Sequence, residues 1–292
     1  MENKSTLYKV FNFPLMKILI GLIVCGGAVT LAQIGGMNLL ASSHMVQDSK
    51  NAIIGFIVSV VAITSYIVLF KFYERRKISE FSLSTLPKNF FLGSIIGIGL
   101  QALVILVIAA YHDYIIVSVN PWLYLIPSIA FGITTAFTEE IIFRGIIYRI
   151  TEEKLGSWIA VIISALLFGA AHLGNAHSSL YSGLAIALEA GVLLSAAYIY
   201  SKTLWLPIFI HFGWNFAESG IFGAPDSGHT MTSTFLVAKF QGNEWITGGA
   251  FGPENSLQAT LFCTIAGCIF LWLAVKQKKI IPPFWKKGQK SI

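Results

Sequence analysis

Apolar runs of about 20 residues recur along the whole chain, separated by short stretches rich in Pro, Gly and charged residues. An α-helix of that length crosses a hydrocarbon core of about 30 Å. With these separators as boundaries, eight membrane-spanning helices are expected, near residues 15–34, 52–72, 90–110, 121–149, 157–173, 180–200, 203–219 and 257–275. The pattern therefore predicts an all-α fold: a polytopic membrane protein with about eight transmembrane helices.

The composition favours a membrane protein over a soluble one. Of the 292 residues, 55% are hydrophobic and only 12% are charged, and the mean hydropathy is +0.72. Because soluble domains carry about 25% charged residues, the composition excludes an ordinary soluble domain. The three cysteines, Cys25, Cys263 and Cys268, lie within apolar runs without metal-ligand spacing, and we expect them to be small core residues.

The basic residues predict the orientation. The net charge of +6 comes from short clusters between apolar runs, which argues against a nucleic-acid partner. If the N-terminus is cytoplasmic, all of the 20 Lys and Arg residues except Lys50 and Lys239 fall on the cytoplasmic side, including Lys4, Lys287 and Lys290. The positive-inside rule then predicts a multi-pass protein of the cell membrane with both termini cytoplasmic. The first apolar run has no convincing signal-peptide cleavage site and is expected to remain as a helix.

We divide the chain into four parts. Residues 1–120 contain helices one to three, 121–219 form a functional core of helices four to seven, 220–256 form an external Gly-rich loop, and 257–292 contain the last helix and a basic cytoplasmic tail. The loop is long for a connection in a compact helical protein, and such loops are often functional or disordered.

Two adjacent carboxylates lie within the fourth apolar run, FGITTAFTEEIIFRGIIYRI. Insertion of one charged residue at the centre of a span costs about 2.5–3.5 kcal/mol, so Glu139 and Glu140 imply a partner or a wet cavity. Glu140 and Arg144 are spaced i, i+4 and can pair on one helix face. Glu139 points about 100° away from Glu140 and is available for another role.

Two further spans carry histidine. Phe168 and His172 lie one turn apart at the end of the fifth, and His211 and Asn215 share a face of the seventh at i, i+4. From a cytoplasmic start near Gly156, His172 lies about 24 Å along its helix, farther toward the outside than Glu139. A tilted fifth span, or a start of that helix outside the hydrocarbon, would reconcile the two depths.

Each group also has a purely structural interpretation. Glu140 and Arg144 could be a buried pair that fixes packing, His172 a satisfied helix-end histidine, and His211 with Asn215 an interhelical hydrogen-bonding pair. Glu189, within the sixth span, is a further candidate contributor. The histidines in loops or at helix ends are expected to be solvated: His44, His112, His177 and His229.

The candidate chemistry is water activation with stabilisation of an oxyanion. Glu139 and His172 could accept a proton from water, and His211 and Asn215 could donate hydrogen bonds to an attacked carbonyl. In a second version, Glu139, His172 and His211 bind zinc with an open position for water. The sequence leaves both versions open. It contains no H-E-x-x-H, no G-x-S-x-G and no pair of intramembrane aspartates.

The order E-E-x-x-x-R, then F-x-x-x-H, then H-x-x-x-N resembles the CPBP family of intramembrane proteases, which comprises type II CAAX prenyl proteases and bacteriocin-processing or abortive-infection relatives. The similarity covers about residues 130–219, with a weaker likeness in GGAFGPENS. It implies an eight-span fold with Glu139 and His172 activating water and His211 and Asn215 at the oxyanion. It also implies supporting roles for Glu140 and Arg144.

We therefore expect an intramembrane endopeptidase that acts on a hydrophobic or lipidated peptide or protein within membrane lipids. The alternative is a non-enzymatic membrane protein, such as a bacteriocin-immunity factor or a transporter, that uses the same polar cluster. A transporter would favour paired broken helices, and no such pairing is visible.

Overall fold

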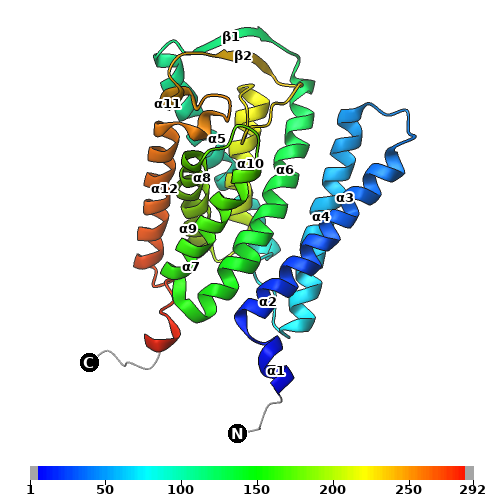
Figure 1. The fold of residues 1–292 in the computed structure, drawn as a ribbon, viewed down its shortest axis with the longest axis vertical. Coiled ribbons are helices and arrows are strands. Elements are labelled where there is room, and N and C mark those ends of the chain that lie inside the picture. The colour runs from blue at the N-terminus through cyan, green and yellow to red at the C-terminus, as the bar shows by residue number, and fades with distance from the viewer. Residues whose placement is uncertain (1–5, 287–292) are drawn as a thin grey trace.

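Long helices stand side by side between a small β-sheet at one end and the elements α1 (Thr6–Phe11) and η9 (Phe284–Lys286) at the other (Figure 1). This computed structural model describes residues 6–286, so Lys4, Lys287 and Lys290 lie outside the described residues. Because the first and last described elements lie at the same end, the chain between them crosses the bundle an even number of times.

The main helices match the expected apolar runs. They are α2 (Pro14–Gly21), η1 (Leu22–Gly26), α3 (Gly27–Leu40), α4 (Gln47–Tyr73), α5 (Leu86–Ala110), α6 (Ile126–Glu140), η4 (Ile141–Tyr148), α7 (Arg149–Ala171), α8 (Leu180–Ile186), η6 (Ala187–Val192), α9 (Leu193–Ser201), α10 (Trp205–Asn215), η7 (Phe216–Ile221) and α12 (Leu257–Lys276). Of these, η1, η4, η6 and η7 are π-helical. The prediction of a polytopic, helical membrane protein is confirmed.

The number of spans depends on how two regions are divided. Within the described residues, six helices are long and apolar enough to cross a membrane, and one of them, Trp122–Gly174, has 53 residues. This helix is interrupted at Gly156, where φ is 78° and ψ is 168°. The seventh predicted span corresponds to α10 and η7, of 11 and 6 residues. The exact count of eight stays a prediction.

The turn at Gly156 requires glycine. Its φ is in the left-handed region, and a Cβ there would lie 2.7 Å from the backbone nitrogen of Pro283. The next residue, Ser157, donates its backbone N–H to the carbonyl of Ile281 at 2.9 Å. The C-terminal segment therefore packs against the break that separates the fourth and fifth predicted spans.

A two-stranded antiparallel sheet was not predicted from the sequence. Strand β1 (Tyr114–Val119) pairs with β2 (Leu236–Phe240), in the register Tyr114 opposite Phe240. The sheet joins the connection after α5 to the long loop before α12, which also contains the short helix α11 (Glu244–Thr247). Residues 220–256 are thus attached to the bundle end by backbone hydrogen bonds.

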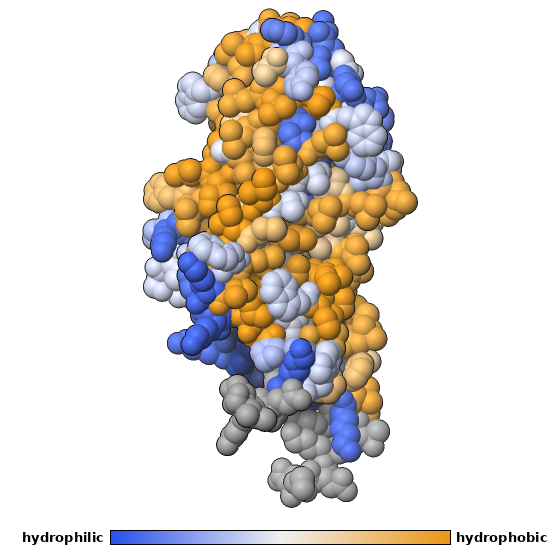
Figure 2. All heavy atoms as spheres, turned by 90° about the vertical axis from the view of Figure 1, so that its left-hand side faces the viewer, coloured by the Kyte–Doolittle hydropathy of each residue, from blue (hydrophilic) through white to orange (hydrophobic). Residues whose placement is uncertain are grey.

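The outer surface is apolar over its middle. Figure 2 shows hydrophobic residues dominating the central part of one face, with hydrophilic residues gathered toward the two ends. Large apolar side chains such as Leu31, Phe72 and Ile95 are exposed at 72%, 70% and 68%, as expected for surfaces in contact with lipid.

Cys268 belongs to that outer surface, so its predicted place in the core is wrong. Cys25 and Cys263 are buried as expected, whereas Cys268 is exposed. On α12, five residues correspond to a rotation of about 140°, which turns Cys268 away from the buried face that carries Cys263.

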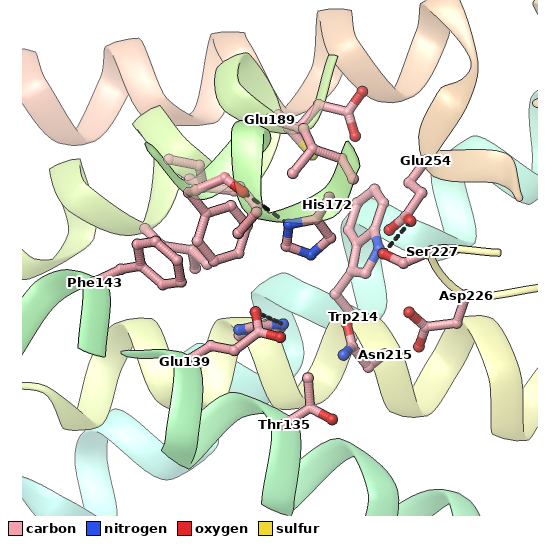
Figure 3. Close-up of a pocket in the computed structure, with 18 of the residues that line it drawn as sticks. Thr135, Glu139, Phe143, His172, Glu189, Trp214, Asn215, Asp226, Ser227 and Glu254 are labelled. Atoms are coloured by element: carbon pink, nitrogen blue, oxygen red, sulfur yellow. Dashed lines mark hydrogen bonds and ion pairs between the residues drawn. The ribbon is translucent and has the colours of Figure 1, made fainter. Parts of the chain in front are cut away.

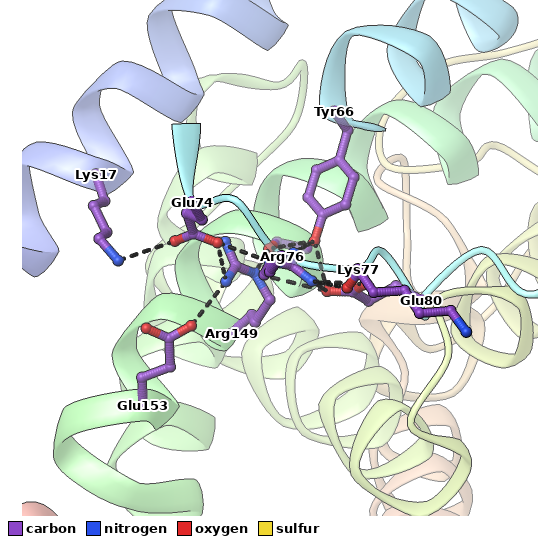
Figure 4. A network of polar contacts seen from close by, with 9 residues as sticks. Lys17, Tyr66, Glu74, Arg76, Lys77, Glu80, Arg149 and Glu153 are labelled. Atoms are coloured by element: carbon purple, nitrogen blue, oxygen red, sulfur yellow. Dashed lines mark hydrogen bonds and ion pairs between the residues drawn. The ribbon is translucent and has the colours of Figure 1, made fainter. Parts of the chain in front are cut away.

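A network of ion pairs joins three helices at the end away from the sheet (Figure 4). Glu74, just after α4, accepts from Lys17 at 3.1 Å, Arg76 at 2.8 Å and Arg149 at 2.8 Å. Its side chain is only 5% exposed. Burial alone would raise the pKa of Glu74, but Arg149, Arg76 and Lys17 together lower it below its ordinary value.

We expect Glu74→Ala to lower the free energy of unfolding by about 3 kcal/mol, because it leaves Arg149 largely buried without its principal counter-charge. The matched control is Glu153→Ala. Glu153 also accepts from Arg149 at 2.8 Å, but its side chain is 45% exposed, so its loss should cost less than about 1 kcal/mol. Thermal unfolding of the purified protein in detergent measures both effects, and equal costs would contradict this account.

The same pair of variants gives a pH test. Because the pKa of Glu74 is lowered from 4.5, its contribution is complete at neutral pH and is lost as the pH falls through the lowered pKa. The stability difference between wild type and Glu74→Ala should therefore shrink at acidic pH, and a constant difference down to pH ~3 would contradict it.

Candidate active site

A cavity of about 240 Å³ lies between α6, α7, η6, α10 and the long loop. Its polar lining includes four carboxylates, three imidazoles and two amides: Glu139, Glu189, Asp226, Glu254, His172, His211, His229, Asn175 and Asn215. The rest of the lining is largely apolar and aromatic. The cavity therefore brings together Glu139, His172, His211 and Asn215, which lie on three separate predicted spans.

Glu140 and Arg144 lie behind the cavity and form the predicted pair. Both side chains are 0% exposed, and Arg144 donates to Glu140 at 2.8 Å. The other terminal nitrogen of Arg144 donates to the carbonyls of Ala190 at 2.7 Å and Gly191 at 3.2 Å, both in the π-helical segment η6. The guanidinium also lies 4.5 Å from the ring centroid of Phe168, within cation–π range.

Glu140 has a second partner that the sequence did not predict. Its Oε1 lies 3.1 Å from Nδ1 of His211. Because a carboxylate accepts, Nδ1 carries the proton, and Nε2 of His211 is left facing Glu139, whose Oε2 is 4.0 Å away. Glu140 therefore orients the imidazole that sequence analysis placed at the oxyanion.

A hydrogen bond to the backbone fixes the tautomer of His172. Its Nδ1 lies 2.8 Å from the backbone carbonyl of Phe168, and a carbonyl can only accept, so Nδ1 again carries the proton. Its Nε2 is then free to accept. Figure 3 shows Glu139 and His172 pointing toward each other across the cavity, so the difference in depth expected from the sequence does not separate them.

Glu139 is the least constrained of these side chains. It is 27% exposed, and its Oε2 is buried without a hydrogen-bond partner among the described residues. Asn215 follows His211 on the same face of α10 and is 4% exposed. A carboxylate without a fixed partner and an imidazole with an available nitrogen are what proton transfer to and from water requires.

The long loop supplies part of the cavity wall, which the sequence did not predict. Asp226, Ser227 and Glu254 enter the cavity on the side of Trp214 (Figure 3). Gly228 donates to the carbonyl of Phe251 at 2.7 Å, which joins the two acidic stretches of the loop. The sequence contains these acids in GAPDSGH and GPENS, but it does not show which helix the loop packs against.

One further acid, Glu189, and a further histidine, His229, also line the cavity. Glu189 is 3% exposed and accepts from Thr260 at 2.7 Å, so it reaches the cavity as a hydrogen-bonded side chain. His229, expected to be solvated, is exposed and also borders the cavity. Burial raises the pKa of Asp226 well above its usual range, and Glu254 and Glu139 add to that shift.

The distances between the candidate ligand atoms bear on the version in which Glu139, His172 and His211 bind zinc. Zinc binds nitrogen and oxygen at about 2.0–2.2 Å, so its ligand atoms must lie close together. In the described part of the chain, the group whose ligand atoms all lie within 4.8 Å is Glu218, Asp226 and Glu254, and the set Glu139, His172 and His211 does not meet this spacing. These three residues are not assembled as a zinc site in this arrangement, and both versions stay predictions.

The fold and the cavity define the class: a multi-pass helical membrane protein with a polar, carboxylate- and imidazole-lined cavity among its helices. Residues 120–217 match the family model described as "Type II CAAX prenyl endopeptidase Rce1-like". This match confirms, for that segment, the resemblance to the CPBP intramembrane proteases.

A curated relative is also named as a membrane peptidase. The Bacillus subtilis (strain 168) protein named "Putative membrane peptidase YdiL" is 37% identical over 73 residues, which is 25% of this chain and 28% of that protein. The chain thus matches little more than a quarter of that relative's length. No solved structure matches the chain.

The two adjacent glutamates allow a matched test of the geometry. We expect Glu140→Gln to lower the free energy of unfolding by about 3–5 kcal/mol, because it leaves the buried Arg144 without a counter-charge. Glu139→Gln should change it by less than about 1 kcal/mol, because the ionic contact of Glu139, with Nε2 of His211, is as long as 4.0 Å and involves no hydrogen bond. Thermal unfolding in detergent separates the two, and a Glu139→Gln variant as destabilised as Glu140→Gln would refute the assignment.

Proposed function

We propose that this chain is an intramembrane endopeptidase that hydrolyses peptide bonds with water activated by Glu139 and His172. One observation carries the proposal: a carboxylate oxygen of Glu139 with no hydrogen-bond partner among the described residues and the available Nε2 of His172 border the same cavity. The family match over residues 120–217 supports peptide hydrolysis as the reaction.

In the proposed mechanism, Glu139 and His172 hold a water molecule, and one of them accepts its proton as the oxygen attacks the peptide carbonyl. The new O–C bond converts the carbonyl into an oxyanion. Asn215 donates to that oxygen, and so does Nε2 of doubly protonated His211, whose Nδ1–H is held by Glu140. The proton then passes to the leaving nitrogen as the C–N bond breaks.

The cavity also suggests the substrate class. Its apolar lining includes Phe131, Phe143, Leu193 and Ile210, which suits a hydrophobic or lipidated segment more than a polar peptide. We propose that the substrate is a peptide with a prenylated CAAX sequence, because the description of the matching family names a CAAX prenyl endopeptidase.

The test uses purified protein in lipid nanodiscs and a quenched fluorescent peptide that ends in a CAAX sequence with a farnesylated cysteine. An unlipidated copy of the peptide is the substrate control. We expect Glu139→Gln, His172→Ala and His211→Ala each to lower kcat/KM by about 10²–10⁴-fold, because each removes a group that acts in proton transfer or on the oxyanion.

His177→Asn is the matched histidine control. His177 is exposed and has a φ of 59°, a conformation that asparagine tolerates, so this variant should keep the wild-type rate. Folded Glu139→Gln and His211→Ala variants with wild-type rates would refute the hydrolase proposal. They would favour the non-enzymatic alternative, an immunity factor or transporter.

Metal dependence is tested with 1,10-phenanthroline, a chelator of transition metals. We propose the metal-free version, so the cleavage rate should be unchanged. Loss of cleavage that is restored by added zinc would instead select the version with Glu139, His172 and His211 as ligands.

A further inference from the structure

Three carboxylates that the proposed mechanism does not use converge beside the cavity. They belong to Glu218 in η7, which continues α10, and to Asp226 and Glu254 in the long loop. One oxygen from each lies within 4.8 Å of the others, and the residues are 0%, 3% and 7% exposed. Three like charges so close together in a buried place repel each other and require compensation.

Hydrogen bonds provide only part of that compensation. Trp214 donates to Glu218 Oε2 at 2.8 Å, and Ser227 donates to Glu254 Oε1 at 2.5 Å. Glu218 Oε1 and Asp226 Oδ2 are buried with no hydrogen-bond partner, and none of the three acids pairs with Lys or Arg within residues 6–286. The unused oxygen atoms are available to a ligand.

A second, independent group is also unused. Gln101 on α5 is 0% exposed, and neither its amide oxygen nor its amide nitrogen has a hydrogen-bond partner in the part of the chain that the structure describes. It continues the face of α5 that contacts α10. A Cβ on Gly93 would lie 3.0 Å from the nitrogen of Ile210, and one on Gly97 would lie 2.6 Å from that of Trp214. Helix α5 also contacts η7, and from the spacing of these two approaches we infer that one further turn along the parallel helices brings Gln101 level with Glu218.

We propose that Glu218, Asp226 and Glu254 bind a hard divalent cation, calcium in the first place, with Gln101 as a neighbouring neutral oxygen donor. Carboxylate and amide oxygens are the ligands preferred by calcium and magnesium. Two ligand oxygens on opposite sides of calcium lie about 4.6–5.2 Å apart, against about 4.2 Å for magnesium. The three carboxylate oxygens lie within 4.8 Å of one another, which is compatible with either ion. Calcium is favoured because it accepts irregular sites built from protein oxygens, whereas magnesium requires near-ideal octahedral geometry and usually keeps several waters.

The cation joins the loop to the helix core. Glu218 lies three residues after Asn215 on the α10 side, whereas Asp226 and Glu254 come from two separate stretches of the loop. A single ion therefore fixes both stretches against the end of α10 and holds the loop wall of the cavity in place. This role does not depend on whether the chain hydrolyses peptides.

The test is thermal unfolding of the full-length protein in detergent, first treated with EGTA and dialysed, then titrated separately with CaCl₂ and MgCl₂. Calcium at about a hundredfold excess over its Kd should raise the Tm by about 5 °C, and magnesium should raise it less. In Asp226→Asn and Glu218→Gln, the calcium-dependent rise should be lost.

These substitutions also give a prediction for the protein without calcium. Removing one of three repelling charges should leave the Tm of the EGTA-treated variant equal to or above that of the wild type, so the loss of response is not a failure to fold. Direct equilibrium binding of ⁴⁵Ca²⁺ to the same samples provides a second readout. The matched control is Glu244→Gln, an exposed acid of the same loop, which should keep the full calcium response.

Two results would overturn the proposal: a wild-type Tm that does not change with either ion, or a calcium response that survives in both Asp226→Asn and Glu218→Gln. The first would mean that protons alone neutralise the cluster, and the second that calcium binds elsewhere. The proposal is separable from peptide hydrolysis, because the zinc test uses a chelator that binds calcium poorly and this test requires no substrate.

Discussion

The buried ion pair between Glu140 and Arg144 is the interaction on which the rest of the core depends. Both groups are fully excluded from solvent, where an unpaired charge would cost several kcal/mol. The pair is stabilised because its remaining hydrogen-bonding capacity reaches other helices. Arg144 donates to carbonyls in η6 and stacks on Phe168 of α7, and Glu140 accepts from His211 of α10. One salt bridge thus fixes the mutual positions of the helices that surround the cavity.

That arrangement leaves the adjacent acid unconstrained. Glu139 faces the cavity while Glu140 faces the ion pair, because successive residues on a helix point about 100° apart. The packing that fixes His211 therefore does not fix Glu139. Segments η4, η6 and η7, which carry Arg144, Glu189 and Glu218, are π-helical, a geometry that often occurs at functional sites.

Local spacing predicted much of this site and long-range contacts did not. The i, i+4 pairing of Glu140 with Arg144, and the shared face of His211 and Asn215, follow from helix geometry alone. The break at Gly156 was also apparent from the sequence. By contrast, the contact between Glu140 and His211 depends on the packing of α10 against α6, and the approach of Asp226 and Glu254 to Glu218 depends on how a long loop folds back. The β1–β2 pairing joins segments more than 100 residues apart. Cys268 was misplaced because the residues around it in α12 are apolar on every face, so the sequence does not indicate which face is buried.

The central claim is that a peptide carbonyl binds between Glu139 and His172 on one side and His211 and Asn215 on the other. The most direct measurement is a high-resolution structure of the Glu139→Gln variant with an uncleaved farnesylated peptide in lipid nanodiscs. The account predicts the scissile carbonyl oxygen within about 3 Å of His211 Nε2 and the Asn215 amide nitrogen, with a water molecule between residue 139 and His172. A peptide bound outside this cavity, or a scissile carbonyl directed away from His211 and Asn215, would contradict it.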